Sequence, residues 1–165
     1  MNLPIGLTST QKGTVNAYLV AASIMLASSG RLSPFVPLSD DHGIDLIALD
    51  KLSQRSVCLQ VKSAIASSKR KTVQFDVQKT TFKPASDLLL LAILFEPATV
   101  SVGTSWLIPM AEVPNVSVEQ PDKYALSPST AATSKDRYQR YRHEGPHSLV
   151  AALLALFDRP SEIPA

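Results

Sequence analysis

The sequence has few of the residues that build disulfide frameworks, metal clusters and phosphate-binding loops. Cys58 is the single cysteine among 165 residues, which excludes a disulfide framework and any multi-cysteine zinc or iron–sulfur site. The six glycines form no phosphate-cradling loop, so nucleotide-driven chemistry is not expected. No GxSxG segment supports serine hydrolysis. A reducing cytoplasm suits a chain with one thiol, and we expect that location.

Long apolar runs are also missing. No stretch approaches the ~20 apolar residues that span a bilayer, so no membrane partner is expected. Segment 15–27 is a short apolar run that resembles a signal peptide, but Asn16 and Ser23 interrupt it and only Lys12 precedes it. We interpret it as part of a helix over 8–29 that is apolar almost all round and therefore deeply buried.

The net charge is small, but the charges are strongly segregated. A total of +2 argues by itself against a nucleic-acid partner. Residues 51–83 nevertheless carry eight basic residues and one acid, 84–122 carry five acids and no Lys or Arg, and 123–143 are basic again. With 45% hydrophobic and 18% charged residues the chain is not disordered, and its length fits one domain over 1–165.

The hydrophobic periodicity predicts a sheet between helices. The predicted strands either alternate between apolar and polar residues or are apolar throughout. They are followed by a loop-rich segment at 114–133 and by predicted helices at 134–142 and 148–157. This order favours an α/β or α+β-like fold with a central mixed β-sheet flanked by helices. The predicted strands lie at 32–38, 44–49, 57–64, 72–77, 88–95 and 105–110.

One arrangement of polar residues points to chemistry. Asp45 lies in one predicted strand, and Gln60 and Lys62 lie two residues apart, roughly 6.7 Å, on one face of the next. If these strands form a hairpin, the Asp45 carboxylate and the Gln60 amide oxygen become two hard oxygen ligands beside a lysine. Mg²⁺ often takes one or two carboxylates and fills its remaining positions with water and substrate phosphates.

The arrangement resembles the PD-(D/E)XK nuclease superfamily, in the variant with Gln before Lys. The matching residues are 40–48 followed by Leu59-Gln60-Val61-Lys62-Ser63, and the helix segment 11–15 and the segments 105–109 and 134–141 are similar too. The resemblance implies a restriction-endonuclease-like fold, with a four-stranded mixed core flanked by helices. It also implies Asp45, Gln60 and the Val61 carbonyl as metal ligands, Lys62 as catalytic lysine, and Mg²⁺ (or Mn²⁺) as cofactor.

From this resemblance we predict a metal-dependent endonuclease that hydrolyses phosphodiester bonds in DNA. The sequence departs from related ones at the first helix, where Asn16 and Ala17 occupy the region that often carries a Glu. Asp40 or Asp41 is the alternative source of a second carboxylate. The missing acid favours a second hypothesis, a catalytically weak or inactive module that binds nucleic acid or a protein partner.

The basic blocks suggest where DNA binds, because phosphate contacts supply most non-specific affinity and tyrosines stack on bases. A homodimer is also considered, with 87–122 as an acidic and apolar interaction face in a third hypothesis. The basic residues expected to contact DNA are Lys69, Arg70, Lys71, Lys79, Lys83, Arg137, Arg140 and Arg142.

Three further features are interpreted as structural. The string from His143 to His147 matches the HExxH zinc motif, but Pro146 would break the helix that the motif needs, so a loop leading into the last helix is expected. His42 is interpreted as a turn residue and Cys58 as a small core residue.

Overall fold

A six-stranded mixed sheet forms the centre of the computed structural model, which describes residues 8–38, 43–66, 69–96 and 98–158. The strand order is β1-β2-β3-β5-β6-β9; β3 and β5 run parallel and the other neighbours antiparallel. The strands are β1 (Leu32–Phe35), β2 (Leu46–Asp50), β3 (Ser56–Ile65), β5 (Leu88–Glu96), β6 (Ser101–Pro109) and β9 (Arg142–Glu144). The predicted central mixed sheet is confirmed, with six strands rather than four.

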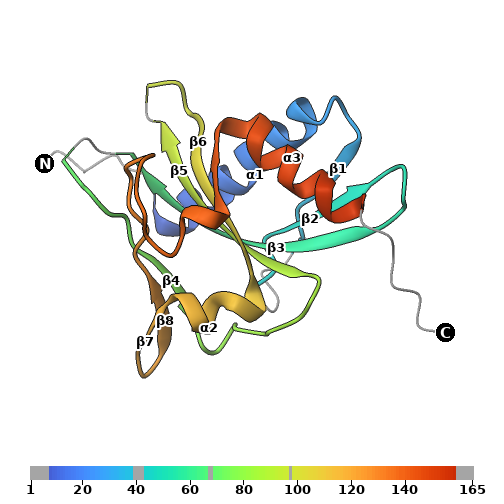
Figure 1. The fold of residues 1–165 in the computed structure, drawn as a ribbon. Coiled ribbons are helices and arrows are strands. Elements are labelled where there is room, and N and C mark those ends of the chain that lie inside the picture. Colours follow the sequence, from blue (N-terminus) through green and yellow to red (C-terminus); the bar gives the residue numbers. More distant parts are fainter. Residues whose placement is uncertain (1–7, 39–42, 67–68, 97, 159–165) are drawn as a thin grey trace, which may run out of the picture.

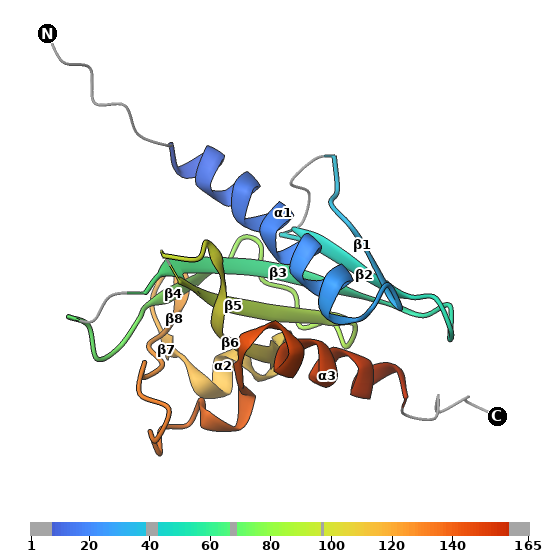
Figure 2. The same ribbon diagram turned by 90° about the horizontal axis from the view of Figure 1, so that it is seen from above.

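Each face of this sheet is covered by different elements. Helices α1 (Ser9–Ala27) and α3 (Gly145–Phe157) lie on one face (Figures 1 and 2). A three-stranded antiparallel sheet lies on the other, together with the short helix α2 (Val113–Val116). Its strands are β4 (Phe75–Gln78), β8 (Lys123–Leu126) and β7 (Val118–Glu119).

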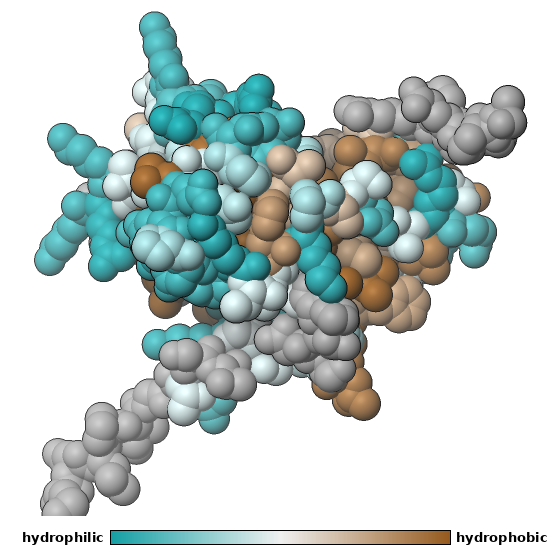
Figure 3. Space-filling model, turned by 90° about the horizontal axis from the view of Figure 1, so that it is seen from below, coloured by the Kyte–Doolittle hydropathy of each residue, from teal (hydrophilic) through white to brown (hydrophobic). Residues whose placement is uncertain are grey.

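Two hydrophobic cores result, and β5 supplies both. Leu89, Leu91 and Ile93 face the helices, whereas Leu88 and Leu90 face the small sheet. A strand buried on both faces needs a continuous apolar run, which is what the sequence has at 88–95. Seen from below (Figure 3), hydrophilic side chains gather on the side of the small sheet, and a hydrophobic area lies on the other side of the molecule.

Helix α1 differs from the prediction in its burial. Thr8 caps its first turn through a capping box with Gln11, as a Thr at this position favours. Val20 is fully buried, but Tyr18 is 60% exposed and Leu26 79%. The expectation of a helix buried all round is therefore wrong, because the sheet and α3 cover only one side of it. No helix in the described ranges is long and apolar enough to cross a membrane.

The segment 114–133 is more regular than its prolines indicate, since it contains α2, β7 and β8. Pairing with β4 organises it: Phe75 lies opposite Leu126 and Val77 opposite Tyr124. The predicted strand at 72–77 provides the partner, so the ladder depends on residues some fifty positions away. Such long-range pairing overrides the local preference for a loop.

The prediction of a helix at 134–142 is wrong. Asp136 accepts hydrogen bonds from the backbone N–H groups of Ser129 and Tyr138, which holds the chain in a turn instead of a helix. The segment has one 3₁₀ turn, Gln139–Tyr141, and then enters β9 beside β6. The last helix begins at Gly145, three residues earlier than predicted, with Pro146 in its first turn, where proline is tolerated.

A buried acid at the end of β2 links acidity to stability. The Asp50 side chain is fully buried and accepts hydrogen bonds from Arg31 Nε at 2.8 Å and from Ser53 Oγ at 2.7 Å. Arg31 also donates to Asp158 at 2.6 Å. The hydrogen bonds from Arg31 hold the pKa of Asp50 well below its usual range. The folded state therefore stabilises the ionised form of Asp50.

We expect the stability of the protein to fall on acidification. A carboxyl whose pKa is depressed by folding contributes stability above its unfolded value of ~3.9 and loses it as the pH falls towards the folded value. Melting temperatures of the wild type and Asp50→Asn should differ most above ~pH 5, and the gap should narrow towards pH 2. The exposed Asp87→Asn controls for the loss of one carboxylate. A difference in melting temperature that stays the same from pH 7 to pH 2 would contradict this role of Asp50.

Candidate functional site

The hairpin of β2 and β3 brings Asp45 next to Gln60 and Val61. Leu46 lies opposite Leu59, so Asp45, one residue before β2, is placed beside Gln60. The Asp45 N–H donates to the Leu59 carbonyl at 2.9 Å, and Asp45 Oδ2 accepts from the Val61 N–H at 2.7 Å. The carboxylate is thus anchored to the backbone of β3, as the hairpin hypothesis requires.

Gln60 is the most unusual residue of the site. Its side chain is 2% exposed, and its Nε2 donates to Thr81 Oγ1 at 3.4 Å. Its Oε1 is fully buried and has no hydrogen-bond partner in the described part of the chain. A buried acceptor without a partner costs about 1–3 kcal/mol, so this oxygen calls for a bound water or ion as its partner.

Gly43 makes room for this amide. Its φ of +72° is one that residues with a side chain rarely adopt. A Cβ at this position would lie 2.6 Å from Gln60 Nε2 and 3.2 Å from Thr81 Cβ. Any larger residue would therefore push Gln60 or the Thr81 loop out of place. Gly43 and Thr81 form the wall behind the Gln60 amide.

Lys62 lies two residues beyond Gln60 on β3, on the same face, and is half-buried. Although burial raises the pKa of Asp76, hydrogen bonds from Lys123 and Gln74 and the charges of Lys123 and Lys62 lower it overall. The charge of Lys62 is thus felt by Asp76 of β4.

A groove of about 920 Å³ beside α1 and β3 includes Lys62 in its lining. Lys12, Lys62 and Arg70 give it three positive charges against one acid, Glu96. Its apolar part comes from α1, β3, β5 and the turn after β5. We call this cavity the Lys62 groove. Its lining brings the first turns of α1, with Lys12, next to Lys62 of β3 and to Arg70.

Asn16 of α1 also lines the Lys62 groove, and its amide donates to Ser63 Oγ. The helix position at which the sequence departs from the expected acid therefore lies against β3. In the described ranges no three His, Cys, Asp or Glu residues are close enough to hold a metal ion. Asp40, Asp41 and His42 lie outside the described residues.

The first basic block is spread around the site. Lys69, Arg70 and Lys71 are exposed before β4, and Arg70 lines the Lys62 groove. Lys79 pairs with Glu119 at 2.6 Å, and the hydrogen bond to this acid raises the pKa of Lys79. Lys83 is exposed, two residues beyond Thr81.

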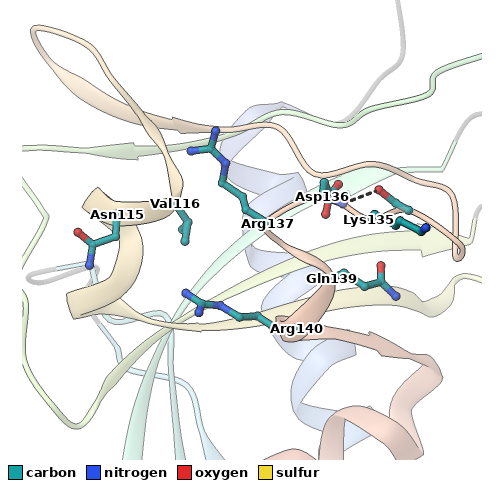
Figure 4. A pocket seen from close by; sticks show the side chains of 8 residues that line it. Asn115, Val116, Lys135, Asp136, Arg137, Gln139 and Arg140 are labelled. Carbon is teal, nitrogen blue, oxygen red and sulfur yellow. Dashed lines mark hydrogen bonds between the residues drawn. The ribbon is translucent and has the colours of Figure 1, made fainter.

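The second basic block borders another hollow. A space of about 640 Å³ lies between α2 and residues 134–140, with Arg137 and Arg140 at its sides (Figure 4). Arg137 is exposed. Arg140 lies over the Tyr141 ring at 4.6 Å and approaches Glu112 at 3.5 Å.

Arg142 does not belong with the other arginines. Its side chain is only 5% exposed and pairs with Glu144 at 2.6 Å. The guanidinium donates to the carbonyls of Ser129 and Thr130 and lies 5.4 Å from the centre of the Trp106 ring. The prediction that Arg142 contacts DNA is therefore corrected, because its donors are used inside the protein.

The other motifs have structural explanations. His143 is in β9 and His147 in the first turn of α3, so the two side chains do not share a helix face as the zinc motif requires. Burial lowers the pKa of His143. Burial is also the main cause that raises the pKa of the Cys58 thiol, which makes it a poorer nucleophile.

Thr81 is the residue that sequence reasoning missed. It lies in the connection between β4 and β5, 21 residues after Gln60, and belongs to no motif. Its only signal in the sequence is its place between Lys79 and Lys83. Contact with Gln60 is created by the way in which this connection folds back over the hairpin.

The arrangement of the chain has a counterpart among solved structures. Its fold is similar to that of a bacterial homing endonuclease. The comparison with this enzyme, I-Ssp6803I, has a TM-score of 0.53 at 20% sequence identity and covers 90% of this chain and 93% of that chain. No protein-family model and no curated protein matches the sequence.

Proposed function

We propose that this protein is a metal-dependent endonuclease of the PD-(D/E)XK type that hydrolyses phosphodiester bonds in DNA. The observation that carries the proposal is the buried, unpartnered Gln60 Oε1 beside the anchored Asp45 carboxylate, with Lys62 on the same strand face. The similarity in fold to a homing endonuclease supports it.

The residues fit a small divalent cation. Asp45, Gln60 Oε1 and the Val61 carbonyl would hold Mg²⁺ or Mn²⁺, since all three offer the hard oxygen atoms that these ions prefer. A bound ion would lower the pKa of a water molecule and offset the charge of a phosphate. A set with one carboxylate implies modest affinity, with water and substrate phosphates completing the coordination.

The protein's own groups prepare the site for this chemistry. The Val61 N–H fixes the orientation of the Asp45 carboxylate, and Gly43 and Thr81 enclose the Gln60 amide. Lys62 would place its ammonium beside the attacking water and a non-bridging phosphate oxygen, where it stabilises the negative charge that develops there. The low exposure of Gln60 strengthens these electrostatic interactions.

The proposed DNA path follows the exposed and half-buried basic residues around the Lys62 groove. Lys12, Lys62 and Arg70 line the Lys62 groove, and their charges match a phosphate backbone. Exposed residues on the flanks would extend the contact along the duplex. These are Lys69, Lys71, Lys83, Arg137 and Arg140, with Lys79 as a further contact despite its pairing with Glu119.

Lys62→Met tests the proposed function. We expect it to lower the rate of DNA cleavage roughly 10²–10³-fold, because it removes the charge that stabilises the transition state and keeps the length of the side chain. Nicking and linearisation of plasmid DNA are measured with Mg²⁺ or Mn²⁺, and with EDTA as the metal-free reference. Lys51→Met, in the exposed turn at the far end of the hairpin, is the matched control. Equal cleavage by both variants would contradict the assignment.

The alternative is a module that binds nucleic acid or a protein partner without cutting. The specific observation that favours it is Asn16, a neutral residue engaged with Ser63 where an acid would strengthen the metal site. The same assay separates the two hypotheses. DNA that is bound but uncut at high Mn²⁺ concentration would support the binding module.

A further inference from the structure

We propose that Thr81 is the positioning residue that decides which end of the Gln60 amide faces the cation. The inference rests on the proposed function, since it assigns Gln60 Oε1 as a ligand. The amide oxygen and nitrogen of a glutamine are nearly the same size, and only one of them is an acceptor. A glutamine in a cation site therefore needs a partner that distinguishes its two ends.

The hydrogen bonds around Thr81 provide this distinction. Its hydroxyl donates to the Gln78 carbonyl at 3.2 Å, so its single proton is used within its own turn. Towards Gln60 the Thr81 oxygen then offers only lone pairs, and it accepts from Gln60 Nε2 at 3.4 Å. An amide turned the other way would place oxygen against oxygen. Thr81 thus selects the orientation that leaves Oε1 on the opposite side, away from the turn.

Packing fixes the place of the amide, and the hydrogen bond to Thr81 then sets which end faces the turn. Gln60 Nε2 lies directly over Gly43, where even a Cβ would approach it to 2.6 Å. The amide is therefore confined between Gly43 and the Thr81 turn, with almost all of its surface buried. The orientation leaves Oε1 buried and without a partner in the described ranges, as a site prepared for a cation would.

The role of Thr81 follows from the presence of Gln instead of an acid. The two oxygens of a carboxylate are equivalent, so a glutamate at position 60 would need no such selection. Partners that orient a metal ligand typically contribute 10–100-fold to metal affinity. We expect this contribution to depend on Gln60, which makes the inference testable by a double-mutant cycle.

The first experiment measures metal affinity. Thr81→Val removes the acceptor with little change in volume, and Thr81→Ser keeps it. Calorimetric titration with Mn²⁺ should show roughly 10–100-fold weaker binding for Thr81→Val and near wild-type binding for Thr81→Ser. In a Gln60→Glu background the effect of Thr81→Val should largely disappear. Equal losses in both backgrounds would overturn the inference, because they would indicate a general structural role.

The second experiment needs no metal. The side-chain NH₂ protons of Gln60 should show NMR contacts to Gly43 in the wild type, as one set of signals. In Thr81→Val a second set, or loss of these contacts, is expected. A spectrum identical to the wild type would overturn the role of Thr81, whatever the protein does to DNA.

The outcomes also separate this inference from the proposed function. If Asp45→Asn and Gln60→Ala bind Mn²⁺ as well as the wild type does, the proposed metal site is wrong. If those variants lose binding and Thr81→Val does not, only the role of Thr81 is wrong. Thermal unfolding of Thr81→Val and Thr81→Ser confirms that both variants fold before either result is interpreted.

Discussion

Asp45→Asn is expected to abolish Mn²⁺ binding and to lower DNA cleavage by about 10³-fold, the largest effect on activity in this protein. Among the described residues of the site, Asp45 is the carboxylate placed beside Gln60 and Val61. Its replacement leaves only neutral oxygens around the cation. Asparagine still accepts a hydrogen bond from the Val61 N–H through its side-chain oxygen, so the hairpin should keep its geometry.

The experiment on Asp45 combines cleavage rates with Mn²⁺ titration and thermal unfolding. Asp87→Asn removes an exposed acid before β5 and serves as the matched control. The control should cut DNA and unfold as the wild type does. A variant Asp45→Asn that unfolds normally and still cuts at the wild-type rate would remove Asp45 from the proposed metal site.

Arg142→Met is expected to lower the free energy of unfolding by about 3 kcal/mol, the largest effect on stability that we predict. The guanidinium joins two carbonyls of the loop before it, Glu144 and the face of Trp106. Methionine keeps much of the apolar stem but satisfies none of these acceptors. The carbonyls of Ser129 and Thr130 lose charged donors, and the loop between β8 and β9 loosens.

Arg137→Met is the matched comparison, because Arg137 comes from the same basic block and is exposed. It should change stability by less than about 0.5 kcal/mol. It should weaken DNA binding and reduce the slope of log affinity against log salt by about 1, if Arg137 contacts a phosphate. Urea unfolding and salt-dependent DNA titration check both variants. A stable Arg142→Met with weakened DNA binding would restore the original prediction for Arg142.

The sequence predicted most of the central sheet because burial leaves a local pattern. The continuous apolar run of β5 reflects a strand that is buried on both faces, and the alternation of β3 reflects a strand whose two faces differ. Strands β7 and β8 of the small sheet were missed for the opposite reason. β7 and β8 are short, their segment contains several prolines, and their pairing with β4 is not visible in any local window.

The helix predicted at 134–142 shows how side chains redirect a segment. Its spacing is compatible with a helix, but Asp136 uses both carboxylate oxygens to hold backbone N–H groups of a turn. In the sequence Arg142 looks like one of several surface arginines. In the structure it is the first residue of β9, which pairs with β6. A local reading cannot distinguish these arginines, because their partners come from distant residues.

The hairpin placement of Asp45 beside Gln60 was predictable. Strand periodicity puts Gln60 and Lys62 on one face, and antiparallel pairing of β2 with β3 brings Asp45 opposite Gln60. By itself the sequence determined five of the six central strands, the two long helices, and the Asp, Gln and Lys of the candidate site. Only the tertiary structure decided which of the scarce glycines matters, and it is Gly43, packed against the Gln60 amide. It also decided that Thr81 faces Gln60 and that Arg142 is internal. The physical reason is the same in each case. Hydrogen-bond partners and close contacts depend on which distant segments meet, and the local periodicity of the sequence does not specify those meetings.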